Sequence, residues 1–264
     1  MTVDVQRKME NYRDAKHLKT RVNLYDYRTP RFEPVDFAAE LMPADPRLVL
    51  DVGCGYGRYV KRLRADHPEA VVVGIDAAPG MLAEVPAPVM AADAQSIPYP
   101  DGCADAVLAM HMLYHVPDIA KAVAEFRRVL KPGGTLLVST NLDEDMTELY
   151  ALWTTAMRKV LGPNAPRADD EILAFNSANA PAYLAAEFDS VERFEKRGVV
   201  SVPEPGPILS YIGSARTFFD IDDADHDRVL AAVGEALDEH FATHERFESE
   251  KVVVFYRCRN SAAT

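Results

Sequence analysis

Three glycines at alternate positions follow an apolar run, in the segment LVLDVGCGYGR of residues 48–58. Glycines such as Gly53, Gly55 and Gly57 adopt positive φ readily and leave room for a ligand beside the backbone N–H groups. A helical pattern over residues 58–65 follows at once, and a helix start offers further unpaired donors. The chemistry that this spacing predicts is binding of a nucleotide-like ligand by the backbone of a turn.

A carboxylate stands at the matching place on the next apolar run. Asp76 ends the segment AVVVGID of residues 70–76, about 20 residues after the glycines, where a strand-terminal acid can accept both ribose hydroxyls. This role suits NAD and S-adenosylmethionine alike. The dinucleotide fingerprint requires a last glycine where Arg58 stands, so the spacing departs from that motif.

Two histidines lie in the stretch AVLAMHMLYHVPD of residues 106–118. His111 and His115 are spaced as in a zinc helix but lack its glutamate, and we predict no metal site. Either histidine could serve as a general base, since its pKa suits proton transfer, or could only stack and hydrogen-bond. Cysteines 54, 103 and 258 fit no disulfide framework, and Cys54 reads as packing under the turn.

The elements that must position these residues alternate between strand and helix. Strands are predicted at residues 48–52, 70–76, 89–94, from 106 and after the Pro-Gly-Gly turn of 132–134, with an amphipathic helix over 117–130. Strand three is expected to end in Asp93. This pattern predicts an α/β fold with a parallel sheet, whose ligands bind at the carboxyl ends of the strands.

Four segments together resemble the class I S-adenosylmethionine-dependent methyltransferases, in the small-molecule group related to ubiquinone and menaquinone biosynthesis. They are DVGCGYG at 51–57, the acid and proline-containing loop from Asp93 to Asp105, HMLYHVPD at 111–118, and RRVLKPGGTLLVST at 127–140. The resemblance implies a doubly wound, seven-stranded, mostly parallel sheet whose last strand is antiparallel. It also implies S-adenosyl-L-methionine as cofactor, its methionine part on the turn and its adenine near Asp93 or the next residue.

These arguments yield two sets of candidate residues. The predicted cofactor-binding residues are Asp51, Gly53, Cys54, Gly55, Gly57, Asp76, Ala77, Met81, Asp93, Ala94, Met110 and Arg21. The predicted catalytic residues are His111, His115 and Tyr25. Arg21 and Tyr25 belong to an N-terminal helical segment, which is either a plain cap or a lid over the ligand.

Beyond residue 141 the sequence departs from the common core. We expect one domain overall, with a cap or lid at 1–47, the cofactor core at 48–141, a helical insertion with substrate-side elements at 142–250, and a final strand and tail at 251–264. Helices are expected at 146–161, capped by the acids of 143–145, near 169–175, at 181–188, 208–219 and 222–240, with a strand at 191–202. Prolines 203, 205 and 207 are expected to form a stiff loop.

Composition limits the partners. The formal net charge is −12, and phosphate-backbone binding needs a basic face, so we predict no nucleic-acid partner. No signal segment or membrane span is apparent, and we expect a cytoplasmic monomer or homodimer acting on a small-molecule acceptor. The predicted function is methyl transfer from S-adenosylmethionine to O or N, as in specialised metabolism. A lyase or cyclase using the same cofactor, a non-catalytic binding partner and RNA methylation stay open as alternatives.

Overall fold

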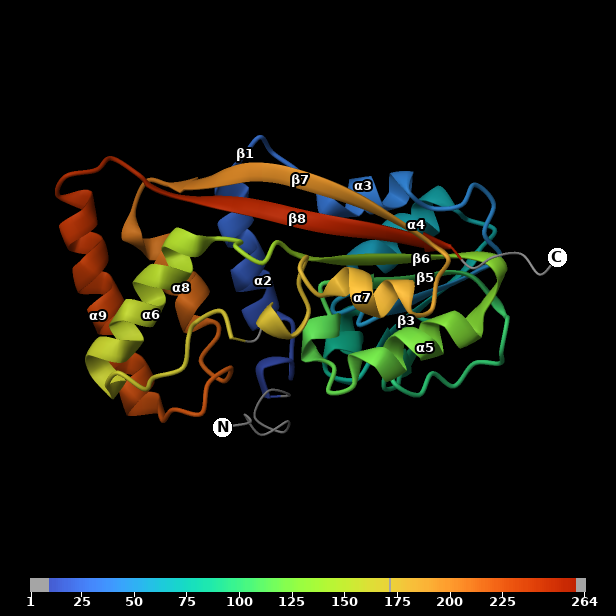
Figure 1. The fold of residues 1–264 in the computed structure, drawn as a ribbon, viewed down its shortest axis with the longest axis horizontal. Helices are drawn as coiled ribbons and strands as arrows, with labels where there is room; N and C mark the ends of the chain where they lie inside the picture. The colour runs from blue at the N-terminus through green and yellow to red at the C-terminus, as the bar shows by residue number, and fades with distance from the viewer. Residues whose placement is uncertain (1–9, 171, 260–264) are drawn as a thin grey trace. The chain divides into compact units, whose positions relative to one another are not determined.

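The computed structural model describes residues 10–170 and 172–259, which divide into two compact units (Figure 1). Unit 1 comprises residues 1–32, 144–171 and 197–252, and unit 2 comprises residues 33–143, 172–196 and 253–264. Residues 1–9 of the predicted cap and 260–264 of the predicted tail lie outside the described residues. Each unit is therefore assembled from three separate stretches of the chain.

The sheet of unit 2 confirms the predicted α/β class. Its strand order is β7-β8-β6-β5-β2-β3-β4, with β2 parallel to both β3 and β5, and β8 antiparallel to β6. An additional two-residue strand, β1 in unit 1, makes eight strands where seven were expected. The bounds are β2 Leu48–Val52, β3 Val71–Asp76, β4 Val89–Ala91, β5 Ala104–Met110, β6 Leu130–Asn141, β7 Ser190–Val202 and β8 Phe247–Arg259.

The order of the strands decides where a ligand binds. The chain runs outward from β2 through β3 to β4, then returns to form β5 on the other side of β2. In such sheets the ligand lies beyond the carboxyl ends of the strands, where the order reverses. That edge carries the glycine turn after β2, Asp76 at the end of β3 and the histidine segment after β5.

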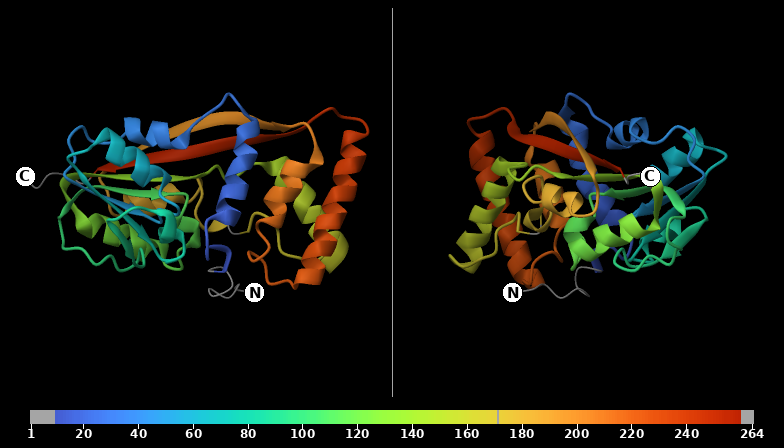
Figure 2. Two further views of the ribbon diagram at one scale, coloured as in Figure 1. Left: turned by 180° about the vertical axis from the view of Figure 1, so that it is seen from behind. Right: turned by 45° about the vertical axis from the view of Figure 1, so that its right-hand side comes forward.

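Helices cover both faces of this sheet. Helices α3 and α4 lie on one face and α5 and α7 on the other (Figures 1 and 2). Helix α5 shows why: Ile119, Val123 and Phe126 form its buried stripe, as its apolar spacing predicts. The bounds in unit 2 are α3 Pro34–Glu40, α4 Arg58–Asp66, η2 Met81–Glu84, η3 Leu113–His115, α5 Ile119–Val129, η4 Ile172–Ala174 and α7 Ala180–Ala185.

Unit 1 is mainly helical. Helix α9 packs against α6 and α8, and α2 packs against α8. Trp153 and Tyr211 are buried in this unit, where the hydroxyls of Tyr150 and Tyr211 are 3.1 Å apart. The bounds are α2 Lys16–Asn23, η1 Leu24–Tyr27, β1 Arg28–Thr29, α6 Thr147–Leu161, α8 Pro205–Gly213 and α9 Asp223–Phe241, together with parts of β7 and β8.

The prediction that the acids of 143–145 cap helix α6 is wrong. The residue before the helix is Met146, which has φ 50° and supplies no side-chain cap. Asp145 instead forms an ion pair with Lys251 and accepts a hydrogen bond from the Val252 backbone N–H, 2.7 Å from its Oδ1. Asp145 therefore links the start of α6 to β8, because it binds the buried Lys251 ammonium instead of the helix N–H groups.

Three other predicted bounds are wrong. Strand β4 ends at Ala91, so Asp93 lies two residues beyond it in a loop. The helix expected near 169–175 is only the short 3₁₀ turn η4. Helix α8 begins at Pro205 rather than residue 208, since proline is compatible with the first turn of a helix, where its missing N–H is not needed.

Among the described residues, no helix has both the length and the apolar character that crossing a membrane requires.

Candidate functional site

The glycine turn has the geometry that its spacing predicts. Gly53, Gly55 and Gly57 have φ values of 70°, 55° and 80°, and Gly57 is the N-cap of α4. A Cβ at Gly53 would lie 2.6 Å from the Met112 Cβ, and one at Gly57 would lie 2.9 Å from a Val85 methyl. Both the backbone conformation and the surrounding space therefore require glycine here.

Asp76 is part of the same turn. Its Oδ2 accepts a hydrogen bond from the Gly55 backbone N–H and its Oδ1 accepts one from the Ala78 N–H, each at 2.9 Å. Burial raises the pKa of this carboxyl, while the two backbone N–H groups oppose the rise. Each oxygen keeps a further lone pair, so the fixed carboxylate can still accept two hydroxyl donors.

Asp51 is the more deeply buried acid. It lies in β2, is 1% exposed, and neither carboxylate oxygen has a hydrogen-bond partner among the described residues. Burial, and secondly the nearby charge of Asp76, raise its pKa to about 7. A deeply buried acid favours a cation beside it, such as an ammonium group, and a role for Asp51 in the ligand site stays a prediction.

The two histidines follow the carboxyl end of β5. His111 has φ 52°, a conformation uncommon outside glycine, and its backbone N–H donates to the Ser139 carbonyl at 3.0 Å. His115 ends η3, near enough to Asp76 to be the smallest of the effects that oppose the rise of its pKa by burial. Its ring lies edge-on to that of Tyr114, with centroids 4.5 Å apart. The structure thus brings His115 beside the turn, and a role for either histidine in proton transfer stays a prediction.

Asp93 begins a loop that is held to α5. Both of its carboxylate oxygens accept from the Gln95 side-chain amide, at 3.0 and 2.9 Å, and the Gln95 Oε1 accepts from the Asp118 backbone N–H. Asp93 is exposed, whereas Ala94 is 5% exposed. An acceptor and a buried small residue therefore lie side by side, as an adenine-binding position would require.

The remaining predicted cofactor residues of unit 2 differ in exposure. Cys54, Met81 and Met110 are buried, whereas Ala77 is exposed. Burial raises the pKa of the Cys54 thiol, so the group is protonated and packs under the turn. All three cysteines are free, and the described residues contain no cluster of histidine, cysteine and acidic side chains that could hold a metal ion.

Arg21 and Tyr25 belong to unit 1. The Arg21 guanidinium donates to the Asn11 side chain at 2.9 Å and to the Ser214 carbonyl at 3.0 Å. Burial raises the pKa of the Tyr25 phenol, and the Lys251 ammonium lies 5.2 Å from its ring centroid. These contacts hold both residues within unit 1. Their roles toward a cofactor or acceptor stay predictions.

Two features around the site were not predicted from the sequence. One is the hydrogen bond by which Asp76 holds the turn, and the other is the role of Arg128, whose guanidinium binds the loop after Asp93. The signal for Arg128 was available in part, since Glu125 precedes it by three residues and an (i, i+3) pair fixes the guanidinium. The carbonyls that it also binds leave no trace in a sequence.

Residues 50–138 match a family described as a methyltransferase domain. The chain carries a class I S-adenosylmethionine-dependent methyltransferase domain. A relative of the predicted group, the demethylmenaquinone methyltransferase of Thermus thermophilus, is 38% identical over 117 residues, covering 41% of this chain and 52% of the relative. The trans-aconitate 2-methyltransferase of Methylobacterium nodulans is 37% identical over 134 residues, covering 48% and 49%.

The methyltransferase fold extends further than this sequence identity. A putative methyltransferase from an antibiotic biosynthesis pathway of Anabaena variabilis superposes with a TM-score of 0.59 at 15% identity, covering 84% of this chain and 95% of that one. The sequence matches span only about half the length of these two curated relatives. The sequence likeness to these relatives is therefore confined to part of each chain, whereas the likeness of the fold covers more of it.

Proposed function

We propose that the protein transfers a methyl group from S-adenosylmethionine to an oxygen or nitrogen atom of a small molecule. The observation that carries the proposal is the joined arrangement of the glycine turn and Asp76, with Gly55 N–H bound to the carboxylate. The turn follows β2, at the start of the residues that match the methyltransferase family.

The residues present fit the cofactor part by part. The turn lacks room for side chains at Gly53 and Gly57 and can approach the methionine part closely. The unpartnered Asp51 carboxylate suits the ammonium group of that methionine, and Asp76 has lone pairs for the ribose hydroxyls. Asp93 and Ala94 would face the adenine, whose amino group needs an acceptor.

The chemistry is a displacement at a sulfonium. The lone pair of the acceptor atom would form the bond to the methyl carbon, and the electron pair of the breaking carbon–sulfur bond would stay on sulfur, leaving S-adenosylhomocysteine. The protein's main contribution is to align the acceptor and exclude water. Where the acceptor carries a proton, His115 or His111 would accept it, whereas the Tyr25 phenol, whose pKa is raised by burial, would act only as a hydrogen-bond donor.

The small-molecule acceptor rests on two observations. The net charge of −12 opposes binding to a polyanion, and both relatives described above have names that specify small acceptors. The relatives differ in acceptor, however, so the atom and the compound come from the segments outside the shared domain. Loops and variable segments commonly determine such choices.

Titration calorimetry with S-adenosylmethionine tests the cofactor half of the proposal. We expect saturable binding by the wild type, and a loss of affinity of at least about tenfold in Asp76→Asn, because an amide supplies one acceptor oxygen where the carboxylate supplies two. Asp45→Asn is the matched control, since it removes the same charge from an exposed position in unit 2. No binding by the wild type would refute the proposal.

Methyl-labelled cofactor tests the transfer itself. Label on a small-molecule acceptor in a metabolite extract supports the proposal. Binding accompanied by label only in unreacted cofactor or in free thioethers would favour the lyase or cyclase alternative. Label in total RNA would replace the small-molecule acceptor with a nucleic acid.

A further inference from the structure

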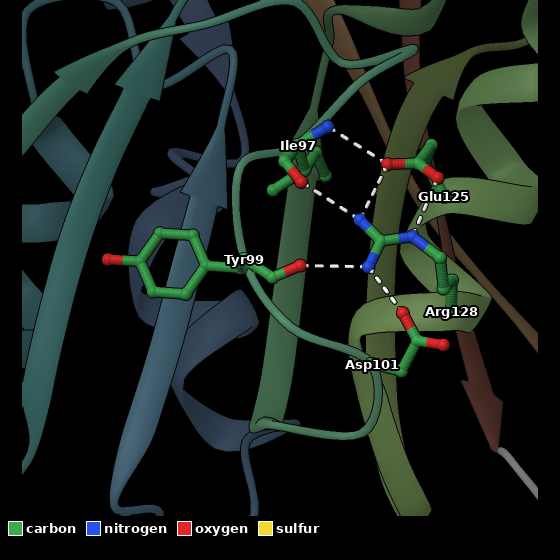
Figure 3. Close-up of polar contacts among 5 residues, drawn as sticks. All are labelled: Ile97, Tyr99, Asp101, Glu125 and Arg128. Atoms are coloured by element: carbon green, nitrogen blue, oxygen red, sulfur yellow. Dashed lines mark hydrogen bonds and ion pairs between the residues drawn. The ribbon is translucent and has the colours of Figure 1, made fainter.

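The Arg128 guanidinium makes five polar contacts, most of them to one loop (Figure 3). Its Nη1 donates to the Tyr99 carbonyl at 2.8 Å and to Asp101 Oδ1 at 2.7 Å, and its Nη2 donates to the Ile97 carbonyl at 2.8 Å. Nε and Nη2 also donate to the two oxygens of Glu125, at 2.7 and 2.8 Å. A single side chain therefore contacts three residues of the segment between Asp93 and Gly102.

Glu125 completes this arrangement. Its Oε2 accepts from the Ile97 backbone N–H at 2.9 Å, so Ile97 is held through both its N–H and its carbonyl (Figure 3). The hydrogen bonds from Arg128 lower the pKa of the Glu125 carboxyl, which therefore stays ionised and keeps the guanidinium in place. The loop 93–101 is thus bound to the last turns of α5 as well as to its start through Gln95.

Exposure shows which of these contacts matter. The Asp101 side chain is 81% exposed, and a pair so open to solvent adds little. The Glu125 side chain is 19% exposed, and the contacts to the Ile97 and Tyr99 carbonyls are partly buried. The planar fork of arginine suits this set, because one rigid group must reach two carbonyls and a carboxylate together.

From this geometry we propose that Arg128 is a positioning residue for the adenine side of the cofactor site. It acts through the loop 93–101, fixing Asp93 and Ala94 at the start of that loop while touching no ligand itself. The inference rests on the proposed function, since it assumes that Asp93 and Ala94 face the adenine. An arginine with a purely structural role would support the fold of unit 2 as a whole and favour no part of a ligand.

A pair of ligands separates these two roles. S-inosylhomocysteine has an oxygen in place of the adenine amino group of S-adenosylhomocysteine and carries a proton on the neighbouring ring nitrogen N1, which is an acceptor in adenine. We expect the wild type to bind the adenosyl ligand at least about tenfold more tightly, the difference of one hydrogen bond to a charged acceptor. In Arg128→Ala we expect weaker binding of the adenosyl ligand. We also expect the ratio of the affinities for the adenosyl and inosyl ligands to fall toward one.

Three comparisons complete the experiment, which uses calorimetry on the full chain. Arg128→Lys keeps the charge without the fork, so part of the preference should be lost even if the alanine variant fails to fold. Arg127→Ala, the adjacent arginine in the same last turn of α5, should keep the wild-type preference. Thermal unfolding of each variant without ligand reports the stability separately.

The possible results differ in what they overturn. Wild-type binding with an unchanged adenosyl preference in both Arg128 variants would overturn the inference and leave the proposed function standing. Equal wild-type affinity for the two ligands would also overturn it, because the loop would then not read the amino group. Absence of adenosyl binding by the wild type would overturn the proposed function and the inference together.

Discussion

Gly53 shows how a single residue type creates the site. Its φ of 70° is one that side-chain-bearing residues rarely adopt, and Met112 occupies the space that a Cβ would need. The conformation turns the Gly53 and Cys54 N–H groups toward the Ile75 carbonyl, at 2.7 and 3.0 Å. The turn is thereby fixed against β3, the strand that ends in Asp76, before any ligand binds.

Replacing Gly53 with alanine should cost more than its backbone conformation alone. Gly102→Ala is a matched comparison, since Gly102 also has positive φ, 59°, but nothing lies within 4 Å of its added Cβ. We expect Gly102→Ala to lower the free energy of unfolding by about 1 kcal/mol, and Gly53→Ala by roughly 1–3 kcal/mol more, because Met112 must move. Urea denaturation measures both, and equal costs would contradict the clash.

For single residues, the sequence predicted which residues lie at the site better than it predicted the hydrogen bonds that they form. The glycines and Asp76 could be placed because parallel strands end at one edge of the sheet, so residues at their ends come together. That Asp76 would bond to Gly55 could not be read, because the two are 21 positions apart and the contact depends on the path of the turn. Arg128 was missed for the related reason that its main partners are backbone carbonyls.

At the scale of elements, the buried pair of Asp145 and Lys251 joins the start of α6 to β8. Both side chains are nearly inaccessible, at 2% and 3% exposure, and Asp145 also accepts from the Val252 N–H. Burial raises the pKa of Asp145 and the Lys251 charge opposes the rise. A buried pair of this kind contributes little net stability, but loss of one partner strands the other charge.

Asp145→Ala should therefore lower the free energy of unfolding by about 3–5 kcal/mol, and adding Lys251→Met should recover much of that loss. The recovery is incomplete because the Val252 N–H still lacks its acceptor. Glu235→Ala serves as the control, since its pair with Lys159 in the same unit is 68% and 64% exposed, and its loss should change the free energy of unfolding far less. A double variant with a lower free energy of unfolding than Asp145→Ala alone would contradict this account.

The same pair explains why some elements were predicted better than others. Strands and helices of unit 2 follow from periodicity, because each buries a continuous apolar face, as α5 does. The predicted cap of α6 was wrong because Asp145 forms an ion pair with Lys251, which is far away in the sequence. The two-residue strand β1 could not be predicted either, since its pairing of Arg28 with Val200 joins segments far apart in the chain.

At the scale of the whole molecule, each unit contains a buried titratable group of opposite kind. Unit 2 holds Asp51, whose pKa is raised to about 7 mainly by burial, and unit 1 holds His226, which is 2% exposed and whose pKa is lowered by burial. The predicted division into a cap at 1–47, a core at 48–141, an insertion at 142–250 and a tail at 251–264 stays a prediction. The two units themselves each combine three stretches, which no local pattern reveals.

These two groups should contribute opposite pH dependences, Asp51 to the stability of unit 2 and His226 to that of unit 1. Folded unit 2 keeps a proton on Asp51 that the unfolded chain releases near pH 4, so its stability falls as pH rises from about 4 to 7, by on the order of 2 kcal/mol between pH 5 and 8. Folded unit 1 resists protonation of His226, so its stability falls as pH drops below about 6.5.

Hydrogen exchange of amides in β5 and α9 at pH 5 and 8, corrected for the intrinsic rate at each pH, measures the opening of the two units separately. Asp51→Asn should flatten the pH dependence for β5 and leave that for α9 unchanged, and His226→Asn should do the reverse. Each variant serves as the control for the other, because both remove one titratable group. A single common pH dependence in both elements, altered alike by either variant, would mean that the chain opens as one body and that neither buried group acts on its own unit.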